Sequence, residues 1–84
     1  MNSSFIPPRL MEGIERYIER GIIPGSFLQA VICNDLCRAV GAADPESLQA
    51  LPALVSHLYH DAPAACWGSH EAMHKWADRQ QVAA

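Results

Sequence analysis

Two pairs of metal-ligating residues stand out in this sequence of 84 residues. Cys33 and Cys37 are four residues apart, and His70 and His74 repeat that spacing, so each pair would share one face of a helix. Two cysteines and two histidines can hold zinc tetrahedrally. However, residues 38–69 separate the pairs, whereas about 12 residues do so in a zinc finger. We therefore favour a core-packing role for the cysteines, with a small zinc-binding regulator as the lesser alternative.

A second group of chemically capable side chains lies in the last third of the chain. His57, His60 and Asp61 would suit a metal ion or proton transfer, but histidines at a helix end also interact favourably with the helix dipole. We favour the dipole interpretation because no third defined ligand stands beside them. Cys66 precedes a predicted helix, yet no nucleophile motif surrounds it. With no phosphate-binding glycine loop and no paired-carboxylate motif, we expect no enzyme, no bound metal and no cofactor.

Charge and composition narrow the classes of partner. Six Lys and Arg stand against nine Asp and Glu, which gives a net charge of −3. The basic residues are scattered, which argues against direct binding of nucleic acid. A mild acidic excess would suit a basic protein surface, such as one that normally holds nucleic acid. No stretch reaches the ~18 apolar residues of a membrane span, and no signal peptide or disulfide framework is recognisable, so we expect a cytoplasmic protein with reduced thiols.

Helices must position these residues. Apolar residues recur at three- and four-residue spacing, and proline and glycine mark the helix starts and stops. We therefore predict an all-α fold, a compact bundle of four to five short helices in a single domain over residues 1–84. The termini, residues 1–6 and 81–84, are expected to be loose. The predicted helices cover residues 8–20, 26–40, 45–50, 52–60 and 70–80.

Polar and aromatic residues inside these helices need an explanation. Leu36 and Val40 continue an apolar stripe along the helix predicted over 26–40, so both are expected in the core. Asn34 and Asp35 interrupt that stripe, although both types disfavour helix interiors. We favour a hydrogen bond to a neighbouring loop, and the alternative is the centre of a contact patch.

The two tryptophans lie close to the C-terminus. Trp67 follows Cys66 and precedes Gly68, and we expect it in the core. Trp76 suits the core and an exposed interface anchor about equally well.

Short motifs spaced along residues 7–77 form a distinctive combination. They are Gly21-Ile22-Ile23-Pro24-Gly25-Ser26-Phe27-Leu28, Ala30-Val31, Asn34-Asp35-Leu36, Ala43-Asp44, Leu51-Pro52, Leu58-Tyr59, Ala62-Pro63, Cys66-Trp67-Gly68-Ser69 and Trp76. This combination resembles a family of small phage and prophage proteins without an assigned activity. The resemblance transfers no catalytic or binding residue. At positions 57 and 60 this chain has histidines, where the family leads us to expect polar or aromatic side chains.

The resemblance implies a function through analogy with other small phage proteins, which often bind and block a host protein. We expect an inhibitor of a host defence complex, most simply an anti-CRISPR protein that covers a CRISPR effector sterically in the host cytoplasm. The alternative is a phage housekeeping or regulatory protein that acts through a replication partner or through self-association as a homodimer. The residues expected to contact the partner are Glu12, Glu15, Glu19, Asn34, Asp35, Trp76 and Asp78.

Overall fold

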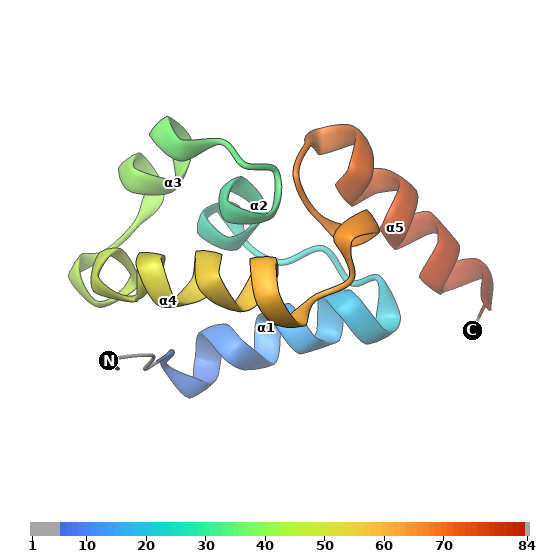
Figure 1. The fold of residues 1–84 in the computed structure, drawn as a ribbon, viewed down its shortest axis with the longest axis horizontal. Helices are drawn as coiled ribbons and strands as arrows, with labels where there is room; N and C mark the ends of the chain where they lie inside the picture. Colours follow the sequence, from blue (N-terminus) through green and yellow to red (C-terminus); the bar gives the residue numbers. More distant parts are fainter. Residues whose placement is uncertain (1–5, 84) are drawn as a thin grey trace.

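The computed structural model describes residues 6–83, and over that range the chain forms five α-helices, one short 3-10 turn and no strand (Figure 1). The predicted all-α bundle is thus confirmed. Its principal extents are 35 × 23 × 19 Å. In chain order the elements are α1 (Pro8–Arg20), α2 (Ser26–Ile32), α3 (Leu36–Ala42), α4 (Pro45–Asp61), the 3-10 turn η1 (Ala64–Cys66) and α5 (His70–Ala83).

The first helix follows the sequence prediction at both ends. Proline at the first helical position fits α1 because no N–H is needed there. Gly21 ends the helix in the left-handed conformation (φ 73°), and its N–H donates to the carbonyl of Tyr17 at 2.9 Å. A side chain at Gly21 would also meet the backbone oxygen of Ala77 at 2.5 Å, so this position needs glycine for conformation and for space.

The helix predicted over residues 26–40 is wrong, because the chain breaks it into α2 and α3. Asn34 adopts the left-handed conformation (φ 60°) just after α2. Its N–H donates to the carbonyl of Val31 at 3.1 Å, and the N–H of Asp35 donates to Ala30 at 2.8 Å. This pair of bonds is the Schellman arrangement that closes a helix C-terminus, with asparagine in the usual place of glycine. Asn34 and Asp35 are therefore a helix stop and not a polar interruption.

The opposite error concerns the two helices predicted over 45–50 and 52–60, which form the single helix α4. Asp44 caps its start by accepting a hydrogen bond from the backbone N–H of Ser47 at 2.7 Å. Pro52 removes one backbone donor, and the carbonyl that loses its partner belongs to Leu48. Both residues lie on the exposed side of the helix, where water can satisfy that carbonyl. The helix therefore continues through proline.

Two clusters of buried side chains hold the helices together. The first joins α1, α2 and α4, with contributions from α3, and its fully buried members include Ile14, Leu54 and Leu58. The second joins α1, α2, η1 and α5 and is rich in sulfur. Its members are Tyr17, Ile32, Cys33, Cys66, Met73, Trp76 and Ala77.

The last helix is attached to the end of the first. Ser69 caps α5 by accepting a hydrogen bond from the N–H of Ala72 at 3.0 Å, as predicted. The side-chain amides of Gln80 and Gln81 donate to the carbonyls of Ile18 and Gly21 at 2.9 and 3.0 Å. These carbonyls lie where α1 ends and have no partner within it. The sequence predicts a loose chain after residue 80, but these bonds carry α5 on to Ala83, while residues 1–5 and 84 lie outside the described range.

Candidate protein-binding surface

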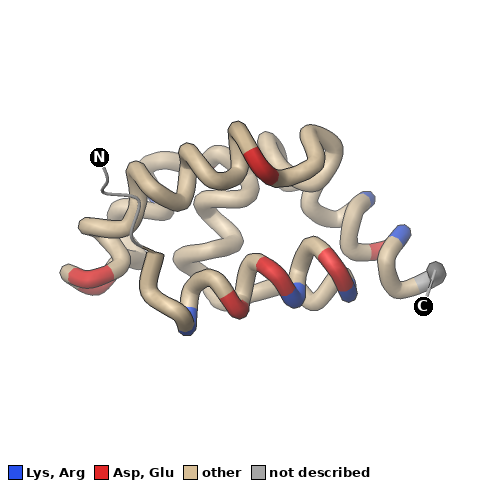
Figure 2. Tube along the Cα trace, turned by 60° about the horizontal axis from the view of Figure 1, so that its bottom comes forward, with Lys and Arg blue, Asp and Glu red and all other residues tan. Residues whose placement is uncertain are grey.

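Three predicted contact residues lie on the outer surface of α1. Glu12, Glu15 and Glu19 are all exposed. Figure 2 shows acidic and basic positions interspersed along this helix. The basic residues there are Arg9, Arg16 and Arg20, so the surface is mixed in sign and not an acidic patch.

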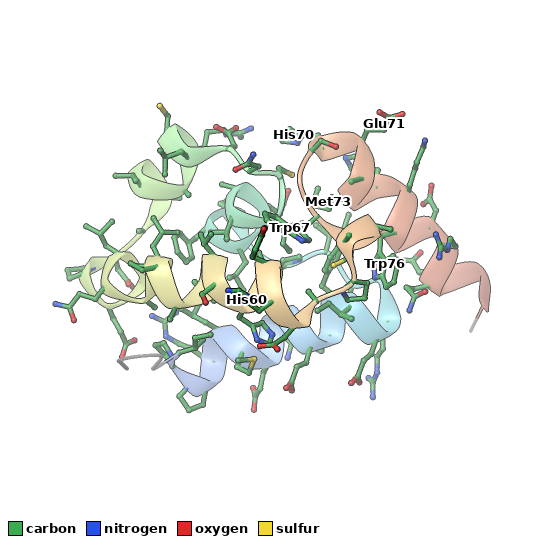
Figure 3. The ribbon with its side chains drawn as sticks, in the orientation of Figure 1. His60, Trp67, His70, Glu71, Met73 and Trp76 are labelled. Carbon is green, nitrogen blue, oxygen red and sulfur yellow. The ribbon has the colours of Figure 1, made fainter. Side chains whose placement is uncertain are left out.

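Two further predicted contact residues lie on α5, and one of them is almost fully buried. Asp78 is exposed. Trp76 is only 9% exposed, and its indole N–H donates to the carbonyl of Ile18 at 3.0 Å. Its ring points from α5 toward α1 (Figure 3), and the guanidinium of Arg79 lies 5.2 Å from the ring centre. The interface-anchor interpretation of Trp76 is therefore wrong, because the indole needs α1 as its hydrogen-bond partner. Trp67 is half-buried and packs against both core clusters.

Asn34 and Asp35 lie at the turn between α2 and α3. The side chain of Asn34 is exposed, whereas that of Asp35 is half-buried. A carboxylate oxygen of Asp35 lies 3.9 Å from Arg38 and 3.8 Å from Nε2 of His70. The sequence predicts a hydrogen bond to a neighbouring loop, but the backbone N–H groups of both residues instead donate to carbonyls of α2. The turn that the two residues form lies beside an apolar surface.

That apolar surface lies on α3 and α4, and it results from the break at Asn34. After the break, the apolar stripe of α2 no longer continues along the next helix. Leu36 is 67% exposed and Val40 is 46% exposed, while Ala39 is the only buried residue of α3. The prediction that Leu36 and Val40 belong to the core is therefore wrong. Both side chains project into solvent from a short helix.

Helix α4 supplies the other half of this surface. Residues 48, 52, 55 and 59 fall on one side of an α-helix, because their spacing of three and four residues matches its turn. Tyr59 is 72% exposed, and Leu48 and Val55 are each a little under half exposed. A shallow hollow of about 40 Å³ connects the two helices, lined by Leu36 from α3 and by Leu51 and Val55 from α4. We call the whole surface the α3–α4 face; its residues are Leu36, Val40, Leu48, Leu51, Pro52, Val55 and Tyr59.

Sequence reasoning missed the α3–α4 face, although two signals in the sequence mark it. The adjacent Asn34 and Asp35 are typical of a helix end, and a break there turns the following apolar residues away from the core. The exposed stripe of α4 repeats the helical period beside a second, buried stripe. An apolar run wider than one face is a sign that part of it lies outside the core.

The four residues considered for the lesser alternative, a zinc site, do not assemble. Cys33 and His70 meet, with 3.4 Å between Sγ and Nδ1, but Cys37 and His74 are both exposed. No group of three or more His, Cys, Asp or Glu side chains within the described range is arranged to hold a metal ion.

The other histidine cluster is also a local contact. Nδ1 of His57 lies 3.4 Å from a carboxylate oxygen of Asp61 one turn later. The ring of His60 meets Tyr59 edge to face, with 5.1 Å between ring centres. Neither histidine is joined by further ligating side chains in the part of α4 where they lie, and this agrees with a role at the helix end.

Burial sets the protonation of the inner cysteines. It raises the pKa of the Cys33 thiol, and the neighbouring Asp35 carboxylate adds to that effect. Burial likewise raises the pKa of Cys66, which is fully enclosed. Both groups are protonated thiols at neutral pH, so neither presents the thiolate that a nucleophile requires.

No known protein family, no curated protein and no solved structure matches this chain. Among the described residues, no helix is both long and apolar enough to cross a membrane.

Proposed function

We propose that this protein acts by binding another protein through the α3–α4 face. The observation that carries the proposal is the exposure of five large apolar side chains on α3 and α4, of which Leu36 and Val55 line one hollow. Scattered apolar residues are ordinary on a surface, but a continuous group of them is typical of an interaction site. The five residues are Leu36 (67%), Val40 (46%), Leu48 (45%), Val55 (44%) and Tyr59 (72%).

The surroundings of this face resemble the rim of a protein interface. Asn34 and Asp35 border the hollow between the helices, and Arg38 follows them on α3. A buried apolar centre with a polar rim is the usual composition of such a surface. Tyr59 is the best candidate for an energetic hot spot, since tyrosine is enriched at such positions.

We infer that the protein is a phage-encoded inhibitor of a host defence complex, and that a CRISPR effector is the first partner to test. The resemblance to small phage proteins supports the source, and the exposed apolar face supports action by binding. Inhibition would be steric, because a rigid α4 laid on the effector would exclude whatever normally occupies that surface. The net charge of −3 favours approach to a basic effector surface, while the apolar face supplies affinity.

The test is co-purification with the CRISPR effector complexes of the host at micromolar concentrations of both. We expect one complex to be retained and its binding of target DNA to be blocked. The double variant Leu36→Glu, Val55→Glu should abolish retention, because it places two charges in the apolar face. Retention by no effector complex would contradict the inhibitor proposal.

A matched control uses the opposite surface. The double variant Arg16→Gln, Arg20→Gln shifts the net charge by the same −2, at two exposed positions of α1, and leaves the α3–α4 face intact. It should retain the partner as well as the unaltered protein does. Loss of binding in this control alone would move the contact to α1, as the sequence first suggested.

Self-association is the second candidate function, because the same apolar face could be covered by another copy of the chain. Sedimentation at tens of micromolar distinguishes the two. A monomer is expected if the face is reserved for a different protein. A stable dimer that Leu36→Glu, Val55→Glu dissociates would favour the housekeeping function.

A further inference from the structure

Three side chains with soft donor atoms converge where α2 ends and α5 begins. Sγ of Cys33 lies 3.4 Å from Nδ1 of His70 and 3.7 Å from Sδ of Met73. His70 and Met73 are three residues apart on α5, so they share one face of that helix (Figure 3). The third donor is the thioether sulfur of Met73. The grouping is hard to find in the sequence because Cys33 lies far from His70 and Met73 along the chain.

We propose that Cys33, His70 and Met73 bind a monovalent soft metal ion, Cu(I), through Sγ, Nδ1 and Sδ. Thiolate and thioether sulfur together select soft ions, and imidazole is compatible with copper. Typical metal bonds are about 2.3 Å to sulfur and about 2.0 Å to nitrogen, so the two separations correspond to angles of about 100–110° at a shared ion. Sγ of Cys33 is thus spaced from each of the other two donors as the ligands of one metal are.

Charge favours a monovalent ion over zinc at this position. Cys33 is only 5% exposed and Met73 only 1% exposed, so a net charge between them would be costly. Binding replaces the thiol proton of Cys33, which leaves to solvent, with the metal ion. Within the three ligands, one thiolate then neutralises Cu(I), whereas a divalent ion would keep one positive charge. Zinc in structural sites also takes four ligands, and this group supplies three.

The environment of His70 completes the arrangement. Its Nε2 lies 3.8 Å from a carboxylate oxygen of Asp35, on the side of the ring opposite Cys33. A carboxylate on the distal nitrogen of a ligating histidine fixes the ring and leaves the other nitrogen free for the metal. The side chain of His70 is 54% exposed, and it borders a cavity of about 430 Å³ between α2, α3 and α5. An ion can therefore reach the imidazole of His70 from solvent on this side.

The test is anaerobic titration of the reduced protein with Cu(I) in competition with a chromophoric chelator. We expect one ion per chain, release of one proton at pH 7 and a rise in Tm. Cys33→Ser should lower the affinity at least about 100-fold, and Met73→Leu, which conserves volume, should lower it by a smaller factor. Asp35→Asn acts through His70 and should lower it roughly 10-fold.

The controls separate this site from other thiols and from loss of folding. Cys37→Ser removes the exposed cysteine and His74→Gln removes the neighbouring exposed histidine; both should leave the affinity unchanged. His70→Gln changes a side chain that is half exposed, so it keeps the proposal testable if Cys33→Ser does not fold. Copper X-ray absorption should show two sulfur donors and one nitrogen donor. Unchanged affinity in His70→Gln and Met73→Leu, or loss of binding in Cys37→Ser, would overturn the proposal, and the contacts would then be only packing of a buried thiol.

Discussion

Asn34 determines where the apolar residues that follow it are placed. Its left-handed conformation (φ 60°) ends α2, and without that turn Leu36 and Val40 would continue the buried stripe. Asparagine tolerates this conformation better than other residues with a side chain, and glycine tolerates it best. The side chain itself is exposed, so the backbone carries its structural role.

The stabilities of variants at position 34 should therefore follow how readily each residue adopts the left-handed conformation, and not how many side-chain contacts it loses. We expect Asn34→Ala to lower the free energy of unfolding by about 1 kcal/mol, and Asn34→Gly to leave it within about 0.5 kcal/mol of the unaltered protein. Urea denaturation measures both. Equal stability of the alanine and glycine variants would show that the turn does not need the left-handed conformation.

At the level of elements, α4 is continuous despite a proline in its interior. Pro52 is exposed, so replacing it removes no buried contact. Pro52→Ala restores the missing donor to the carbonyl of Leu48, although the flexible alanine also increases the entropy of the unfolded chain. We expect a net gain of about 1–2 kcal/mol in the free energy of unfolding, less than the ~3 kcal/mol quoted for an interior helix position.

Thermal and urea denaturation should agree on that gain, and far-ultraviolet circular dichroism should show no loss of helix. A decrease in stability would mean that the proline ring makes a favourable contact or that α4 bends to accommodate it.

The same helices show what the sequence predicts and what it does not. Local signals were sufficient for α1, because proline, glycine and a single apolar stripe all agree at Pro8, Tyr17 and Gly21. They were also sufficient for the start of α5 at Ser69. The middle of the chain was harder because its local rules conflict. Apolar spacing continued across Asn34 where the helix stops, and Pro52 suggested a break where the helix continues.

The α3–α4 face was not predictable from periodicity, because which of two apolar stripes is buried depends on the position of the other helices. Leu54 and Val55 are adjacent in sequence and chemically alike, yet the first is fully buried and the second is 44% exposed. The meeting of Cys33 with His70 was equally hidden, since it depends on the packing of α5 against α2. Tertiary contacts decide both.

On the scale of the whole molecule, the sulfur-rich core makes the free energy of unfolding decrease at alkaline pH. Burial raises the pKa of Cys33, Cys66 and Tyr17 above their ordinary values. The phenol of Tyr17 is further enclosed, donating to the carbonyl of Cys66 at 2.6 Å. At alkaline pH the folded chain therefore keeps protons on these three groups that the unfolded chain has already released.

It follows that the contribution of these groups to stability is fully present well below about pH 8.5, the pKa of an unfolded thiol, and is lost as pH rises through that value toward the folded pKa values. We expect the free energy of unfolding to fall steadily from about pH 8.5 upward, measured by urea denaturation under reducing conditions. Cys66→Ala should make that decline shallower, whereas Cys37→Ser, which removes an exposed thiol, should leave it unchanged. An alkaline slope that is the same in all three proteins would contradict the explanation.

The attachment of α3 through one buried residue, Ala39, has a consequence for how such a protein would change over generations. Outward residues that do not support the core can be replaced at a cost of about 0.5 kcal/mol or less. Leu36 and Val40 are such residues, so selection can alter what the surface recognises without endangering the fold. Asn34, Ala39 and Gly21, by contrast, are constrained by geometry. Variants selected for an altered surface would therefore differ at the first two positions and keep the other three.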